Sequence, residues 1–237
     1  MDNNSNLPKK KKGHGSFLTC FIIALILVFG AYFAWNYLES GSLFHSGKVY
    51  SARDFGIETV KSPNDRDGDG IDDYTDMVAT ARAYINTHPI YDGSYFDGGY
   101  PPRGRGCCAD VIWKALDGAG YDFKAMIDAD IASNTGAYGL TDRVDRNIDF
   151  RRVFNLQTYF ERNGITLTCD VEDIAQWQPG DIIIYYNSAD NSGHVAMVSD
   201  KRNAEGKPYI IHHRSSGAFE EDNIGYKEII GHYRFIG

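Results

Sequence analysis

The spacing of apolar positions divides the chain into a helical part and a later, strand-rich part. Cys108, Ile112 and Ala115 recur at helical spacing, so a helix is expected to begin at the cysteines. Gly118–Gly120 supplies the glycines that commonly end a helix. Two further helices are predicted, at Thr75–Asn86 and at Val153–Asn163.

The last third of the chain contains short β-rich runs, separated by turns rich in Gly, Pro and Asn. Four strands are predicted, at Asp181–Tyr186, Val195–Ser199, Tyr209–His213 and Ile229–Phe235. Helices followed by an antiparallel meander are typical of an α+β fold. We therefore expect N-terminal helices packed on an antiparallel sheet.

An apolar run near the N-terminus predicts a membrane anchor. Phe17–Leu38 contains 22 residues without a charge and follows Lys9–Lys12. At a rise of about 1.5 Å per residue it spans roughly 33 Å, enough for a hydrocarbon core of about 30 Å. The lysines predict a cytoplasmic tail at residues 1–16 and an extracellular chain after the span. A cleaved signal peptide is the alternative, but no small-x-small site precedes Glu39.

Composition and charge narrow the classes of function. The 237 residues, 43% of them hydrophobic, suffice for one globular domain and an accessory segment. Residues 1–40 carry a net charge of +2, so the remainder carries −10 of a total of −8. Such an acidic remainder argues against nucleic-acid binding. Residues 39–64 are polar and contain Gly and Ser, which indicates a stalk.

An aspartate-rich loop, residues 65–76, precedes the first predicted helix. Its carboxylates stand at positions 1, 3, 5, 9 and 12, with glycine at position 6, as a calcium loop requires. The candidate ligands are Asp65, Asp67, Asp69, Ile71 through its carbonyl, Asp73 and Asp76. Position 12 is Asp and not the Glu of a sensor loop, so we expect a structural, weakly bound ion. A solvated acidic linker is the alternative.

The cysteines give the first indication of chemistry. Cys20 lies in the apolar run, and the three others, Cys107, Cys108 and Cys169, leave at least one thiol without an internal partner. A helix start favours a nucleophilic cysteine, because free N–H groups and the helix dipole stabilise the thiolate. Helical phase places Cys108 on the apolar face and turns Cys107 sideways. Adjacent cysteines also lack the C-x₂₋₄-C spacing of a zinc site.

Histidines on the predicted strands are candidates for the base. His194 opens the strand HVAMVS, and the next strand ends in His212-His213. Either of the latter can hold the imidazole of His194 in the useful tautomer. Strand alternation does not say which face is the cleft, so both stay candidates. A packed cysteine and a merely hydrogen-bonded histidine are the structural alternatives.

Several motifs resemble a bacterial family, domain of unknown function 1287, and do so in the same order along the chain. They are Gly106–Trp113, Asn147–Asn155, Trp177–Ile184, Gly193–Lys201, Pro208–His213 and Gly231–Phe235. The similarity covers about Thr75 to Gly237. This family is similar to the NlpC-like cell-wall peptidases of the papain-like clan, which implies a papain-like domain over residues 75–237.

In that clan a cysteine opens a helix, a histidine opens the second strand, and a polar residue on the third strand orients the histidine. Cys108, His194 and His212 match these places, so the resemblance implies a Cys-His-His triad. The family's Cys-x-Asp pattern is reproduced at Cys108–Asp110. Cys107 stands where an aliphatic residue is more typical.

Roles outside the triad are expected for several residues near the motifs. Asp110 either caps backbone N–H groups, which is the favoured role, or contacts substrate. Tyr100, in the Gly- and Tyr-rich segment before the cysteines, is a second candidate for substrate binding. Asp149, Arg151 and Arg152 are expected to form an internal brace of ion pairs.

The expected function is that of a membrane-anchored, extracellular cysteine amidase or peptidase. Its expected partner is cell-wall peptidoglycan, whose peptide bonds it would cut without a catalytic cofactor; calcium would be structural only. One alternative is a catalytically inactive surface-binding module of the same fold. Another is a transferase that uses the same thioester chemistry. The hydrolase and the transferase require Cys108, whereas the binding module does not.

Overall fold

The computed structural model describes residues 23–31, 48–141 and 143–237. The chain divides into two compact units, Met1–Gly47 and Lys48–Gly237. Each unit is described by itself.

Residues 23–31 of the first unit form a helix. None of the helices within the described residues combines the length and the apolar character needed to cross a membrane. The predicted tail, most of the predicted span 17–38 and residues 39–47 of the predicted stalk lie outside the described residues.

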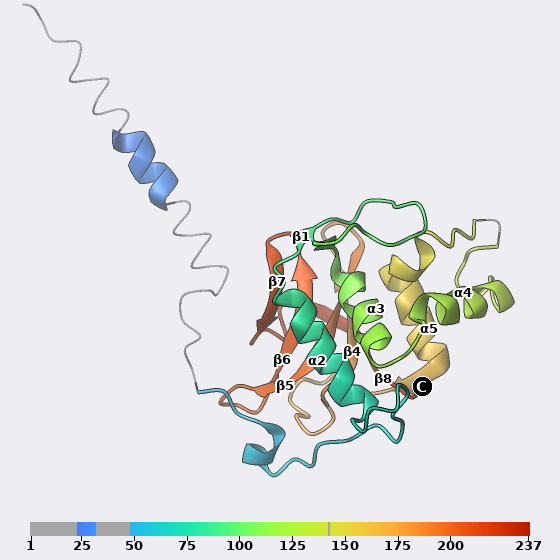
Figure 1. Cartoon of the computed structure of the whole chain (residues 1–237). Coiled ribbons are helices and arrows are strands. Elements are labelled where there is room, and N and C mark those ends of the chain that lie inside the picture. Colours follow the sequence, from blue (N-terminus) through green and yellow to red (C-terminus); the bar gives the residue numbers. More distant parts are fainter. Residues whose placement is uncertain (1–22, 32–47, 142) are drawn as a thin grey trace, which may run out of the picture. The chain divides into compact units, whose positions relative to one another are not determined.

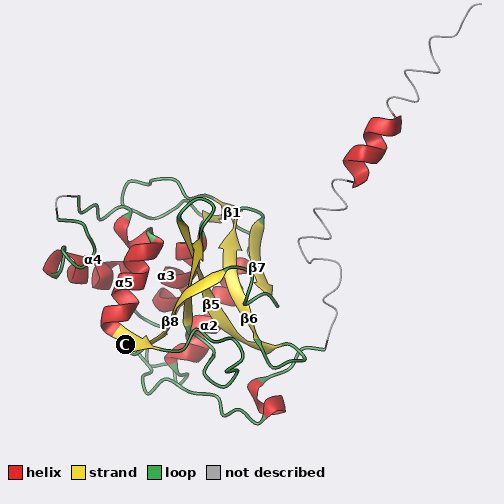
Figure 2. Ribbon diagram, turned by 180° about the vertical axis from the view of Figure 1, so that it is seen from behind, coloured by secondary structure: helices red, strands yellow, loops and turns green. Residues whose placement is uncertain are grey.

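Within the described part of the second unit, helices lie on one face of an antiparallel sheet (Figures 1 and 2). The helices are α2 (Asp73–Ile85), α3 (Cys108–Gly118), α4 (Phe123–Ser133) and α5 (Val153–Asn163), with short 3₁₀ turns η1 (Ala52–Phe55) and η2 (Asp149–Arg151). The strands of the sheet are β3 (Gly164–Thr166), β4 (Ile182–Asn187), β5 (Ser192–Arg202), β6 (Pro208–Arg214), β7 (Gly217–Glu221) and β8 (Glu228–Phe235). A separate parallel pair consists of β1 (Ile90–Tyr91) and β2 (Arg105–Gly106). The predicted α+β class is therefore confirmed.

The strand order departs from the predicted simple meander. The order is β3-β8-β4-β5-β6-β7, so the last strand returns across the sheet to pair with β4, with Ile183 opposite His232. The residue pattern of the sequence predicted strand β8 but not the strand with which it pairs, because pairing depends on where β8 buries its side chains. Tyr233 and Phe235 of β8 join the core under the helices.

Predicted helices agree with the observed ones to within two residues, apart from one that was missed. α4 was not predicted, although Phe123, Ile127 and Ile131 recur every four residues and are all buried. Asp122 caps this helix, since its carboxylate accepts the N–H of Ala125 at 3.0 Å. The sequence therefore contained the signal for α4, both in its period and in its cap.

Each face of the sheet has its own core. Val195, Met197 and Ile211 face the helices. The alternate positions Ala196 and Val198 pack with other residues on the second face, under a loop that carries Trp177. This second face contains the histidine side chains that the site requires.

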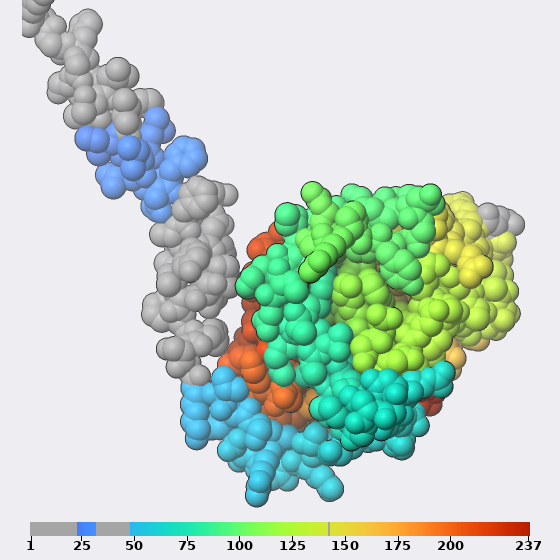
Figure 3. Space-filling view, viewed as in Figure 1, coloured from blue at the N-terminus to red at the C-terminus, as the bar shows by residue number. Residues whose placement is uncertain are grey.

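The predicted stalk ends earlier than residue 64, because residues 48–64 are attached to the domain. Tyr50 and Arg202 exchange backbone hydrogen bonds of 2.9 and 2.8 Å. The N–H of Val60 donates to Gln178 at 3.0 Å. The segment forms a continuous part of the domain surface (cyan in Figure 3). A stalk extending to residue 64 is thus wrong: its polar composition reflects an exposed segment held by backbone hydrogen bonds.

The helices α2 and α3 cross closely at Gly118, which yields a stability prediction. A Cβ atom at Gly118 would lie 2.1 Å from the hydroxyl oxygen of Thr80 on α2. Gly118→Ala should therefore lower the free energy of unfolding by about 1–3 kcal/mol, because the helices must move apart. Urea unfolding of the full chain measures the change.

Gly136→Ala is the matched control, because a Cβ atom there meets nothing within 4 Å. It should change stability by less than about 1 kcal/mol. Equal losses in the two variants would show that the helix crossing is not tight.

Candidate active site

The start of α3 is fixed by local contacts that place Cys108 at its first position. Asp110 accepts the N–H of Cys107 at 2.6 Å, which stabilises the first turn. Gly106 lets the chain pass closely, since a Cβ atom there would lie 2.2 Å from the Tyr84 hydroxyl. The first N–H groups of a helix have no intrahelical acceptor. Cys108, which is 6% exposed, therefore lies beside free backbone donors.

The start of β5 supplies two partners for the Cys108 thiol. The His194 side chain acts on the thiol by hydrogen bonding and by charge, and the N–H of Val195 donates toward the same sulfur. Within the described ladder, β5 and β6 pair only from Met197 onward. The beginning of β5 is therefore open to the start of α3, which packs against both strands.

Behind His194, three side chains form a hydrogen-bonded series. His194 Nε2 lies 3.0 Å from His212 Nδ1, and His212 Nε2 lies 3.1 Å from a carboxylate oxygen of Glu221. The other oxygen of Glu221 accepts a hydrogen bond from Arg214 at 3.0 Å. The structure thus selects His212, and not His213, as the neighbour of His194.

This series fixes the tautomers of both histidines. Burial lowers the pKa of His212, so its ring is neutral at neutral pH. A carboxylate such as Glu221 only accepts, so His212 donates from Nε2 and accepts at Nδ1. His194 must then donate from Nε2, which leaves Nδ1 as the nitrogen that exchanges a proton with the sulfur of Cys108.

Glu221 keeps its negative charge although it is partly buried. Burial works against ionisation, but the hydrogen bond from His212 and the charge of Arg214 outweigh it and lower the pKa of Glu221. A permanent acceptor therefore terminates the series at neutral pH.

The two adjacent cysteines have thiols of opposite pKa shift. The hydrogen bond from Cys107 is the largest effect on Cys108, and with the hydrogen bond and charge of His194 it holds the pKa of the Cys108 thiol well below its usual value, against the effect of burial. The same hydrogen bond, followed by burial, raises the pKa of Cys107. Cys108 is therefore the thiolate and Cys107 the protonated donor.

Asp110 is bound entirely by protein groups. Arg151 donates to its two oxygens at 3.0 and 2.9 Å, and Trp113 Nε1 donates at 2.7 Å. The Asp110 side chain is 0% exposed. These contacts match the favoured capping role, and they leave no oxygen free to meet a substrate, so the substrate-binding assignment is not retained.

Arg151 acts as a brace, but its carboxylate partner is Asp110, outside the predicted cluster, in which Arg152 lies 3.5 Å from Asp149. The guanidinium of Arg151 also donates to the carbonyls of Ser94 and Asp92, at 2.8 and 3.0 Å, and to the sulfur of Cys107 at 3.5 Å. It therefore ties the loop before the cysteines to the start of α3.

Two other residues singled out in the sequence, Tyr100 and His213, do not belong to the central series. The ring of Tyr100 packs on Trp113 and Phe150, at 5.0 and 5.5 Å between centroids. No contact of Tyr100 with Cys108 is found within the described residues. His213 stacks edge-on against Tyr91, with 5.4 Å between centroids, and one of its buried ring nitrogens has no partner in the described part of the chain.

The aspartate loop lies at the other end of α2, where part of the predicted ligand set comes together. Ligand atoms of Asp65, Asp67 and Asp69 lie within 4.8 Å of one another. One oxygen of Asp76 is buried without a partner among the described residues. Asp73 is engaged elsewhere, since its oxygens accept the N–H of Arg66 and the hydroxyl of Tyr121.

Comparison with known proteins now adds the family. The model of a domain of unknown function (DUF1287) matches residues 78–235. The chain belongs to this family. It is also 36% identical over 164 residues to the uncharacterized protein YijF of Escherichia coli strain K12, a match that covers 66% of this chain and 78% of the relative. No solved structure gives a significant match.

Residues 78–235, which match the family model, include Cys108, His194, His212 and Glu221. They also include the motif at Trp177–Asp181, whose role here is structural. Asp181 pairs with Arg234 at 2.8 Å and with His232 at 2.9 Å, and the Trp177 ring stacks on His232 at 3.7 Å. This motif holds the second face of the sheet together and does not touch the thiol.

Sequence reasoning missed Glu221 and Tyr226. Glu221 lies on β7, a strand that the sequence did not predict. Tyr226 packs edge-on against His194 and His212, with 5.7 and 5.5 Å between centroids. The only available signal was a carboxylate pair, Glu220-Glu221, one turn after the histidines. That signal gives no register, so it could not identify a partner.

The unequal thiols yield a prediction for alkylation. Iodoacetamide reacts with the thiolate, so the rate at Cys108 should change by less than about threefold between pH 8 and pH 6. Burial raises the pKa of Cys169, so its rate should fall about tenfold for each pH unit. Mass spectrometry of the labelled peptides gives both rates in one sample.

The change of the alkylation rate with pH is the informative quantity, because burial of Cys108 slows its absolute alkylation rate at every pH. His194→Ala should steepen the slope at Cys108 and leave Cys169 unchanged. A tenfold fall per unit at Cys108 in the unmodified chain would remove the thiolate assignment.

Proposed function

We propose that this chain is a cysteine hydrolase that cuts amide bonds, on a papain-like fold. The observation that supports it best is the series from Cys108 through His194 and His212 to Glu221, which combines a low-pKa thiol with a base of fixed tautomer. A buried structural cysteine needs neither feature.

The first half of the reaction forms a thioester. The sulfur of Cys108 attacks the amide carbonyl carbon, and N–H groups at the start of α3 stabilise the oxyanion. His194, protonated at Nδ1, gives its proton to the nitrogen of the leaving amine as the C–N bond breaks. His212 accepts from His194 Nε2 throughout, so the ring keeps its orientation.

The second half releases the acid. Nδ1 of His194 removes a proton from water, whose oxygen attacks the thioester carbon. The C–S bond breaks and Cys108 leaves as the thiolate. Glu221 stabilises the positive charge that His194 carries in each half-reaction, through His212, without being protonated itself.

The substrate that we propose is the peptide part of cell-wall peptidoglycan. Support comes from the sequence: the lysine cluster and the apolar run at residues 17–38 suit a single-pass anchor, with residues 48–237 outside the cell membrane. An anchored hydrolase at that place meets wall peptides first.

Substitution of the four residues tests the proposal, with purified muropeptides as substrates for the full chain. Cys108→Ala and His194→Ala should lower kcat/KM by roughly 10³-fold or more. His212→Ala and Glu221→Gln should have intermediate effects, about 10- to 100-fold, because they act through His194. Mass spectrometry of the products measures the rates.

Two comparisons separate positioning from folding. His212→Asn also accepts from His194 Nε2, so it should retain more activity than His212→Ala. Cys107→Ala should have an intermediate effect, because it removes the hydrogen bond that lowers the pKa of Cys108 most, and Cys169→Ala should have no effect. Activity that survives Cys108→Ala in a folded protein would exclude the cysteine mechanism.

We also propose that the aspartate loop binds a structural calcium ion. Burial, with the charges of Asp69 and Asp67, raises the pKa of Asp76 to about 6, which shows an acidic cluster that lacks a counterion among the described residues. Its buried, unpartnered oxygen is a suitable ligand atom. Asp73, already hydrogen-bonded, is not required as a direct ligand.

Chelation tests this ion. A chelator should lower the Tm of the full chain by several degrees, because an ion that binds only the folded state stabilises it. Asp67→Ala combined with Asp69→Ala should abolish the response, whereas Glu205→Gln, an exposed carboxylate elsewhere, should retain it. A Tm that changes with neither chelator nor millimolar calcium would show that the loop is only an acidic linker.

A further inference from the structure

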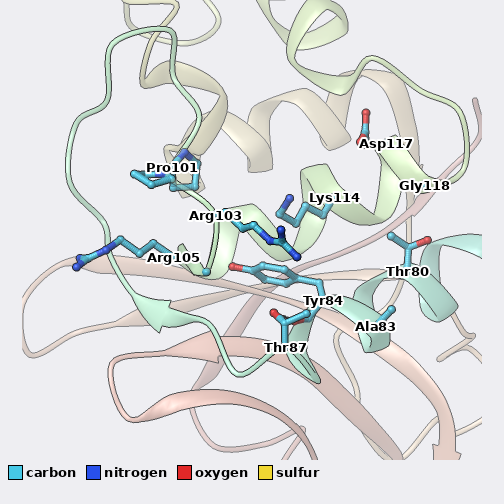
Figure 4. A pocket seen from close by; sticks show the side chains of 12 residues that line it. Thr80, Ala83, Tyr84, Thr87, Pro101, Arg103, Arg105, Lys114, Asp117 and Gly118 are labelled. Atoms are coloured by element: carbon cyan, nitrogen blue, oxygen red, sulfur yellow. Dashed lines mark hydrogen bonds between the residues drawn. The ribbon is translucent and has the colours of Figure 1, made fainter.

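A pocket of about 610 Å³ lies between α2, α3 and the loop before the cysteines (Figure 4). Its volume is within the range of binding sites for small ligands. The loop contributes Pro101, Pro102 and Arg103, and α3 contributes Lys114. Neither Cys108 nor the two histidines of the series line it, so it is distinct from the thiol site.

Two cations in this pocket, Arg103 and Lys114, form no ion pair with any residue that the structure describes. No carboxylate lies within ion-pair distance of Arg103 or Lys114 among the residues that the structure describes. Lys114 instead lies over the rings of Trp113 and Tyr84, at 4.1 and 5.4 Å from their centroids. In Figure 4 the ends of Arg103 and Lys114 both point toward the region above Tyr84. Like charges gathered in a cavity of an acidic protein favour an anionic ligand.

The remaining charges of the pocket do not neutralise this pair. Arg105 is already paired with Asp92 at 2.9 Å, and in Figure 4 it extends away from the pocket. Asp117 lies at the opposite end from Arg103 (Figure 4). The end of the pocket near Tyr84 is therefore positively charged.

Tyr84 lines the pocket and connects it to the segment before the cysteines. Burial, followed by the charge of Asp110, raises the pKa of Tyr84, so its hydroxyl stays protonated. The hydroxyl lies 3.5 Å from His213 Nδ1 and against Gly106. The pocket thus lies beside the segment that leads to Cys108.

We propose that this pocket binds a free carboxylate of the peptide substrate, at a distance from the bond that is cut. The inference rests on the proposed function. A carboxylate is the anion that a peptide substrate offers to two such cations. Pro101, Pro102 and Ala83 supply apolar surface for the adjoining side chain.

The geometry also limits where the carboxylate stands in the substrate. Gly104 lines the pocket, and Cys108 follows four residues later. Four residues reach at most about 14 Å. The recognised carboxylate should therefore lie within three or four residues of the cleaved amide.

Binding to the full chain that carries Cys108→Ala tests the proposal without turnover. The probes are peptidoglycan stem pentapeptides with all carboxylates free, and the same peptides with all carboxylates amidated. Calorimetry should show a Kd about tenfold higher for the amidated form. Arg103→Gln and Lys114→Gln should each raise the Kd of the free acid about tenfold and leave that of the amide unchanged, whereas Arg103→Lys should restore part of the affinity.

Arg105→Gln is the matched control, since it changes the same residue type in the same loop but removes a cation that is already paired. It should leave both Kd values unchanged. Arg103 is exposed, so its variants should keep the Tm of the parent.

Equal affinity for acid and amide, equal losses from Arg105→Gln and Arg103→Gln, or no binding of either peptide would overturn the proposal. Inorganic phosphate that binds as tightly as the acid peptide would also overturn it, because the pocket would then be a general anion site. A different result is that the chain with Cys108 intact binds the peptides with the expected pattern and yet does not cleave them. That result would contradict the proposed function and still support the carboxylate pocket.

Discussion

The buried ion pair between Asp110 and Arg151 determines the geometry of the site. Both side chains are almost completely buried, and both are satisfied by hydrogen bonds in addition to their mutual contact. Loss of one partner in such a pair typically costs about 3–5 kcal/mol, because the other charge is left buried and unpaired. The pair therefore holds three things in one arrangement: the first turn of α3, the loop before it and the thiol of Cys107.

The position of Cys108 follows from this brace, and its reactivity follows from the sheet. The helix start provides free N–H groups, but β5 provides His194 and the N–H of Val195. The base is in turn oriented by residues from β6 and β7, so three neighbouring strands define one ring orientation. A shift in the register of any of them by one residue would turn its side chain to the other face of the sheet and break the series.

The proposed functions are distributed around the two central helices. The thiol lies at the start of α3, the cationic pocket lies between α2 and α3 behind it, and the aspartate loop leads into the start of α2. Asp67 also packs against Gly120, just after α3. An ion in the loop would therefore fix the ends of both helices, and with them the width of the pocket.

The sequence by itself determined the helices at Cys108 and Val153, four of the strands, the likeness to the family and the residue types of the site. These features depend on local period, caps and turns, which neighbouring residues encode. Only the tertiary structure decided between His212 and His213 and showed that Glu221 accepts a hydrogen bond from His212. It also showed that protein groups donate to both oxygens of Asp110 and that β8 pairs with β4. Each of those depends on partners far apart in the chain, and alternation along a strand gives two faces without saying which one carries the partner of His194.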